Sequence, residues 1–284
     1  MKFKFFLMAA TIASGALALA PTSARAGAYI FAGTDADDHG SAPGTTNVAG
    51  WLFMQRALEN LASKVTTTNK TVYTLGTDPS TKAANAASSA FFKSSLVGAG
   101  WTFATINGVA DLTTFLTGGS VGGATLTNTG ILMLDSGKNI SGGISSAEEA
   151  VLTAHALSLN GVLTAGGGIF SQANSYGFLT ALLPGAAATD LGTGGVGGGL
   201  LLTAAGTAAF PSLTNGDLSS GRWHSFFTGI GATPILAISN ETTPRDVVIG
   251  NSSGSIIINA PEPFSLALLG TGLAGIALIR RRRA

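Results

Sequence analysis

The sequence predicts an α/β fold in which a mostly parallel sheet is flanked by helices. From residue 27 onward, short apolar runs alternate with amphipathic stretches, which is the pattern of successive strand–helix–strand units. No cysteine is present, so disulfides, thiol nucleophiles and thiolate metal sites are excluded and a buried core has to supply the stability. Between two unusual ends lie about 230 residues, enough for one sizeable domain.

The first half of this domain shows the clearest alternation. We expect strands at four apolar runs, residues 28–33, 71–75, 101–106 and 131–134. Helices are expected between them, at residues 48–65, 80–96 and 110–116.

The most distinct helix is predicted at residues 145–159. Ser145 and Glu148 have the spacing of a capping box, in which the hydroxyl accepts from an unpaired amide and the acid reaches back to the start of the helix. A fifth strand is expected at 162–165 and a further helix at 171–182.

The remaining elements are predicted from weaker patterns. Residues 185–199 are rich in glycine and alanine and indicate a long loop. Strands are expected at 234–239, 246–249 and 255–258, the last two forming a C-terminal β-hairpin extension around residues 251–254.

The N-terminus has the composition of a secretory signal peptide. Lys2 and Lys4 precede an apolar stretch over residues 5–20, and Ala24-Arg25-Ala26 fits a small-residue cleavage site. Residues 1–26 are therefore expected to be removed, leaving an exported domain at 27–259. An uncleaved N-terminal anchor is the alternative.

The C-terminus, residues 260–284, combines a kink, an apolar run and a basic stop. Pro261-Glu262-Pro263 precede an uncharged run at 264–279, which as a helix would be roughly 24 Å long and is predicted to cross the membrane. Arg280, Arg281, Arg282 and Arg283 follow and are expected to stay on the cytoplasmic side.

This C-terminal pattern resembles the PEP-CTERM sorting signal of Gram-negative bacteria. The resemblance implies that an exosortase-like membrane protease cuts near Pro261-Glu262-Pro263, so that a transiently anchored protein passes to the cell surface or the extracellular polysaccharide. A permanent C-terminal anchor is the alternative.

The net charge of the chain between the two ends bears on its partners. Residues 27–279 hold eight basic and 14 acidic side chains, a net charge of −6. An acidic surface argues against nucleic acid or anionic lipid as the main partner.

The segment from Gly130 to Gly168 resembles a class I glutamine-amidotransferase-like, flavodoxin-like domain. It has a strand ending in Asp135, an acid-capped helix, and a glycine-rich turn at 165–168. The resemblance implies that this turn occupies the place of the catalytic cysteine of active members. Because the turn holds only alanine and glycine, which carry no nucleophile, the resemblance implies a shared scaffold without the amidotransferase chemistry.

The densest polar cluster follows the first predicted strand. Asp35, Asp37 and Asp38 offer hard oxygen ligands to Ca²⁺ or Mg²⁺, and His39 is a candidate base or ligand. An EF-hand is disfavoured because Thr46 stands where its glutamate belongs. A solvated turn held by its own aspartates is the alternative.

Two later segments could reach the same edge of the sheet. Asp135 follows the fourth predicted strand, beside Ser136 and Lys138, and His224 lies in an aromatic segment at 221–227. Trp223 of that segment is a candidate platform for a sugar ring, or else a core anchor.

From these patterns we expect a surface or matrix protein with a structural or interaction role linked to exopolysaccharide. The alternative is an extracytoplasmic hydrolase or carbohydrate-binding enzyme in which His39, Asp135 and His224 converge at the carboxyl edge of the sheet.

Overall fold

The computed structural model describes residues 27–135, 137, 140–173, 175–192 and 194–250. The strands are β1 (Ala28–Ala32), β2 (Gly40–Ser41), β3 (Val48–Ala49), β4 (Thr71–Leu75), β5 (Thr102–Ile106), β6 (Ile131–Leu134), β7 (Gly168–Ser171), β8 (Ala187–Asp190), β9 (Leu200–Leu202), β10 (Ser225–Thr228), β11 (Ile235–Ser239) and β12 (Asp246–Gly250). The helices are α1 (Gly50–Ala62), α2 (Lys82–Phe92), α3 (Val109–Leu116), α4 (Ser146–Ala154), α5 (Ala156–Thr164), α6 (Leu179–Leu182), α7 (Ala204–Ala209) and α8 (Asn215–Leu218), with a short 3₁₀ turn at Leu126–Asn128.

Ten strands form one sheet with a parallel half and an antiparallel half. Strands β5, β4, β6, β7 and β1 are neighbours in that order and are all parallel. Strand β12 pairs antiparallel with β1 and connects the sheet to β10 and β8 on one path and to β11 and β9 on another. The predicted α/β class with a parallel core is confirmed.

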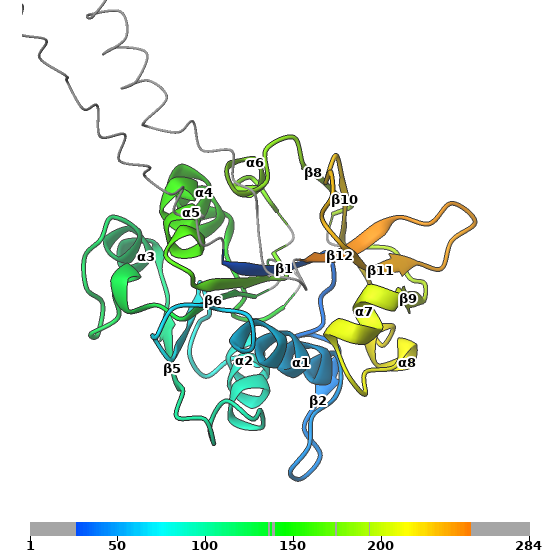
Figure 1. Ribbon diagram of the computed structural model, residues 1–284, viewed down its shortest axis with the longest axis horizontal. Coiled ribbons are helices and arrows are strands. Elements are labelled where there is room, and N and C mark those ends of the chain that lie inside the picture. Colours follow the sequence, from blue (N-terminus) through cyan, green and yellow to red (C-terminus); the bar gives the residue numbers. More distant parts are fainter. Residues whose placement is uncertain (1–26, 136, 138–139, 174, 193, 251–284) are drawn as a thin grey trace, which may run out of the picture.

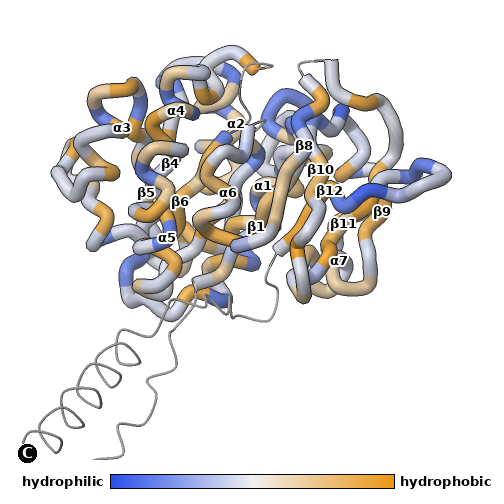
Figure 2. Tube along the Cα trace, turned by 90° about the horizontal axis from the view of Figure 1, so that it is seen from above, coloured by the Kyte–Doolittle hydropathy of each residue, from blue (hydrophilic) through white to orange (hydrophobic). Residues whose placement is uncertain are grey.

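Helices cover both faces of this sheet. Figure 1 shows α1, α2 and α7 on one side and α4, α5 and α6 on the other. The sequence of β1 explains the two cores, because Ile30 faces one and Tyr29 and Phe31 face the other, and all three are buried. In Figure 2, apolar residues run along β10 and β12, and the loop beside β11 is polar.

The region after β6 differs from the prediction. The expected helix at 145–159 is two helices that meet at His155, and the expected strand at 162–165 is the end of α5. Val162 and Leu163 are apolar because they face the core from a helix, which a short apolar run does not distinguish from a strand. Strand β7 begins after Gly166, whose φ of 83° ends the helix.

The second half of the chain holds elements that the sequence patterns missed. The expected helix at 171–182 is reduced to α6, and the expected loop at 185–199 contains the edge strand β8. The expected strands at 234–239 and 246–249 are confirmed as β11 and β12, which pair with each other. Because β12 lies between β1 and β10, this hairpin is part of the sheet; the strand expected at 255–258 lies outside the described residues.

Among the residues that the structure describes, no helix is both long enough and apolar enough to span a membrane. The predicted signal peptide at 1–26, the sorting motif and the membrane segment at 264–279 lie outside those residues.

The predicted capping box at the start of α4 is confirmed and also joins two helices. Glu148 accepts hydrogen bonds from the Ser145 amide at 2.9 Å and from the Ser145 hydroxyl at 2.7 Å. Its other oxygen accepts from the Gly108 amide at 2.8 Å, at the start of α3.

Replacing Glu148 with alanine is expected to lower the free energy of unfolding by about 2 kcal/mol, because the amides at the starts of α3 and α4 lose their shared, buried acceptor. Urea unfolding measures this. The matched control is Asp217→Ala, which removes a capping box at the exposed start of α8 and should cost less than about 1 kcal/mol. Equal losses in the two variants would contradict the linking role of Glu148.

Candidate functional site

Polar side chains gather where the parallel strands end. The carboxyl ends of β1, β4, β6 and β7 lie at one edge of the sheet, and each is followed by polar residues that are at most 3% exposed. They are Thr34, Asp35, Asp37, Thr77, Asp135 and Gln172. Edges of this kind are where open α/β sheets bind ligands.

Asp35 is the centre of this cluster because one of its oxygens contacts two histidines. Asp35 Oδ2 lies 3.0 Å from Nε2 of His224 and 3.1 Å from Nε2 of His39. His39 belongs to the same turn, whereas His224 is 189 residues away in sequence. Two of the three candidate catalytic residues therefore lie against one carboxylate.

A close backbone contact places His224. The carbonyl of Gly33, directly after β1, accepts hydrogen bonds from the His224 amide at 2.6 Å and the Ser225 amide at 3.2 Å. A Cβ atom on Gly33 would lie 1.7 Å from the Ser225 carbonyl oxygen, so only glycine permits this approach.

Two acceptors flank the ring of His224 and favour its imidazolium form. Its Nδ1 lies 2.9 Å from the Gly192 carbonyl and its Nε2 faces the Asp35 carboxylate, so both ring nitrogens point at acceptors and both have to donate. Burial acts to lower the pKa of His224, but the hydrogen bonds to Asp35 and Gly192 and the charges of Asp35 and Asp190 raise it above its ordinary value of 6.5.

Asp135 is a second buried acid at this edge, and its surroundings favour the protonated form. It is fully buried at the end of β6, where its Oδ2 accepts a hydrogen bond from the Thr77 hydroxyl. Burial and then the nearby charge of Asp37 raise its pKa well above 3.8, more than the Thr77 hydrogen bond lowers it. Asp135 therefore lies beside Asp37, and no described hydrogen bond joins it to either histidine.

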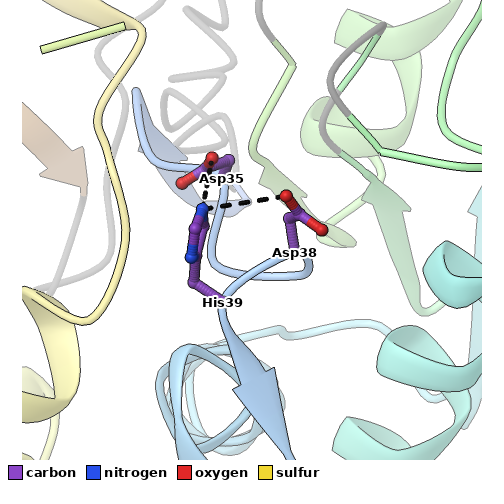
Figure 3. A group of neighbouring side chains, drawn as sticks. All are labelled: Asp35, Asp38 and His39. Carbon is purple, nitrogen blue, oxygen red and sulfur yellow. Dashed lines mark ion pairs between the residues drawn. The ribbon is translucent and has the colours of Figure 1, made fainter.

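The predicted metal ligands are only partly brought together. Oxygen and nitrogen atoms of Asp35, Asp38 and His39 lie within 4.8 Å of one another, and Figure 3 shows both carboxylates directed at the same ring nitrogen. Asp37 is not in this group, because its carboxylate accepts from the Asp38 amide at 3.0 Å and its side chain lies near Asp135.

Two basic side chains already contact the carboxylates of this group. Lys82 Nζ lies 2.5 Å from Asp38 Oδ1, and His224 lies against Asp35. A divalent cation would have to displace Lys82 from Asp38 and His39 from its present contact. The Asp38 amide also donates to the Asp35 carbonyl at 2.9 Å, as in the aspartate-rich turn that was the alternative to a metal site.

Other candidates lie elsewhere. The glycines at 166–168 lead into β7 at the amino edge of the sheet, Gly168 being its first residue, and so cannot correspond to a nucleophile turn that follows a strand. Trp223 is fully buried, so it is a core anchor and the sugar-platform interpretation is wrong. His155 joins α4 and α5. Ser136 and Lys138 lie outside the described residues.

Sequence patterns did not single out Gly33, Thr77 and Gln172. Thr77 follows a strand that was predicted, so the rule that parallel strands end at one edge could have found it. Gln172 could not be found in this way, because its strand was placed at 162–165.

Comparison of the chain with known protein families, with curated proteins and with solved structures finds no match.

Proposed function

We propose that this protein is exported, sorted to the cell surface or the extracellular matrix, and binds exopolysaccharide there through the carboxyl edge of its sheet. The resemblance of residues 260–284 to the PEP-CTERM signal supports the sorting, and the signal-peptide pattern of residues 1–26 supports export. An exosortase-like protease is the partner that this sorting requires.

One observation supports placing the binding site at this edge. At the carboxyl edge, the half-buried side chains of His39 and Asp38, 35% and 27% exposed, lie beside the buried carboxylate of Asp35, and the exposed Lys82, at 49%, contacts Asp38. They present donors and acceptors at fixed positions, which is what recognition of sugar hydroxyls requires.

For the scaffold, we propose a flavodoxin-like arrangement in cyclically permuted form. Strands β5, β4, β6 and β7 follow the spatial order 2-1-3-4 of such sheets, and the first strand, β1, stands in the fifth place. From β4 the next strand in the chain lies on one side, and from β6 the next strand lies on the other, so the winding direction of the sheet changes between β4 and β6. Such a point is the usual position for a ligand site in these sheets, and Thr77 and Asp135 follow the two strands.

A hydrolase is the second candidate, and the contact between Asp35 and His39 favours it. Because the carboxylate can only accept, His39 has to donate from Nε2, which leaves Nδ1 as a base in the neutral ring. Such a base can take a proton from water, while the charged His224 stabilises the Asp35 carboxylate.

Sorting is tested by mass spectrometry of the protein recovered from cells and from medium. We expect a mature chain that begins near Gly27 and ends near Pro263, because both terminal segments are removed. A mature chain that keeps Arg280–Arg283 in the membrane fraction would show a permanent anchor instead.

Binding is tested by co-sedimentation with the extracellular polysaccharide of the producing cells, using the released protein. His39→Ala with Lys82→Ala should lower the bound fraction at least about tenfold, the loss expected for two charged or polar hydrogen bonds. His155→Ala, which removes a histidine between helices, is the control and should bind normally. Release of reducing ends that depends on His39 would identify the hydrolase.

A further inference from the structure

The strand β5 forms one end of the sheet, and its outer edge is unpaired among the described residues. It pairs only with β4, in parallel, over all five of its residues. The Thr102 amide donates to Lys70 and the Ile106 carbonyl accepts from Gly76, so residues 102, 104 and 106 face inward. The backbone groups of Phe103 and Thr105 therefore face outward.

This edge lacks the features that usually prevent strands from pairing. Its sequence, Thr-Phe-Ala-Thr-Ile, contains no charge and no proline, and its register with β4 is unbroken. The sheet has two further ends: β8 contains Asp190, and β9 is only three residues long. An uncharged five-residue edge strand is unusual in a monomeric protein.

An exposed aromatic cluster lies beside the same edge. Phe92, at the end of α2, is 61% exposed and its ring centroid lies 5.9 Å from that of Phe103. Phe103 in turn stacks on the buried Phe91 at 5.2 Å. Val97, 45% exposed, belongs to the loop that leads from α2 to β5. Clustered apolar side chains of this kind mark interaction surfaces.

We propose that β5 pairs antiparallel with β5 of a second copy of this chain, about a two-fold axis at Ala104. In that register Phe103 lies opposite Thr105 of the second copy, and the outward backbone groups of these two residues form hydrogen-bonded pairs on both sides of the axis. The pairing brings no like charges together, because the strand has none.

The side chains fit the same register. The two copies of Phe103 become diagonal neighbours on one face, within reach of each other for aromatic rings, and each brings Phe92 with it. Ala104, exposed and small, meets its own copy at the axis as a pair without hydrogen bonds, whose Cα atoms lie about 4.5 Å apart. This interface is separate from the carboxyl-edge site and does not depend on its function.

The absence of cysteine from the sequence makes the test direct. A single Ala104→Cys substitution in the full-length chain should form a disulfide-linked dimer under mild oxidation, because a Cα separation of about 4.5 Å is within disulfide range. The matched control is Ala187→Cys, which places the same thiol at an exposed position on β8. We expect Ala104→Cys to cross-link at least about tenfold faster than the control.

A second variant tests the same register without a cross-link. Ala104→Lys places two ammonium groups together at the axis, and sedimentation in detergent should show a monomer where the unmodified chain is a dimer. Ala187→Lys should leave the dimer intact. Cross-linking of Ala104→Cys no faster than Ala187→Cys, or a chain that sediments as a monomer before substitution, would overturn the proposal.

Discussion

Replacing Asp35 with asparagine is expected to lower the free energy of unfolding by about 3–5 kcal/mol near pH 6, the usual cost of removing one partner from a buried ion pair. His224 is 1% exposed, and the Asp35 carboxylate, 3.0 Å from its Nε2, is placed to balance the charge of the protonated ring. Asparagine keeps the size of the side chain but not the charge, so the imidazolium remains buried without a counter-ion or has to lose its proton.

Asp38→Asn is the matched control for this change. It is the same substitution three residues later, at a carboxylate that is 27% exposed and pairs with the exposed Lys82. Surface pairs contribute little, so we expect a loss below about 1 kcal/mol. Urea unfolding of both variants decides the result, and equal losses would show that Asp35 is not a buried counter-ion.

Replacing Asp135 with asparagine is expected to stabilise the protein by about 1–3 kcal/mol at pH 8. The fully buried carboxyl beside Asp37 has to ionise against both burial and a like charge, whereas asparagine has no charge and can still accept from Thr77. Thermal or urea unfolding at pH 8 measures the gain, with the exposed Asp111→Asn as a control that should change little.

The pH dependence of stability follows from the same two groups. Asp135 has a folded pKa above its unfolded value near 3.8, so the folded state retains a proton that the unfolded state releases, and stability falls as pH rises above about 4. His224 also has a raised folded pKa, so its contribution is complete below about 6.5 and is lost as pH rises through the folded value. Both predict greater stability at pH 5 than at pH 8, and Asp135→Asn should reduce that difference.

A stabilising Asp135→Asn would also be informative about function. Buried, uncompensated polar groups that reduce stability are often kept because a site needs them. Loss of polysaccharide binding in a variant that is more stable would place Asp135 in the carboxyl-edge site, whereas unchanged binding would leave it outside.

The sequence predicted four of the five strands in the parallel half of the fold because each of these is a short apolar run next to a helix. It predicted β1, β4, β5 and β6 closely. It failed after α4 because Val162 and Leu163 are apolar in both a strand and a buried helix. It also missed β8, whose residues are mostly exposed and carry no period that indicates a strand.

The site was predictable in part for a similar reason. Asp35, His39 and Asp135 follow recognisable strands, so the rule that parallel strands end at one edge places them together. The sequence could suggest that His224 approaches this edge, but its contact with Asp35 depends on the tertiary approach of Gly33 to Ser225. The Gly192 carbonyl, which helps raise the pKa of His224, is indicated by no local pattern.

A buried imidazolium at His224 and the Asp35 carboxylate organise the carboxyl edge of the sheet, and nitrogen-15 NMR of the imidazole rings tests this most directly. His224→Gln assigns the signals. We expect both nitrogens of His224 to be protonated at pH 7 and to titrate above 6.5. A neutral His224 ring with one protonated nitrogen at pH 7 would contradict this account.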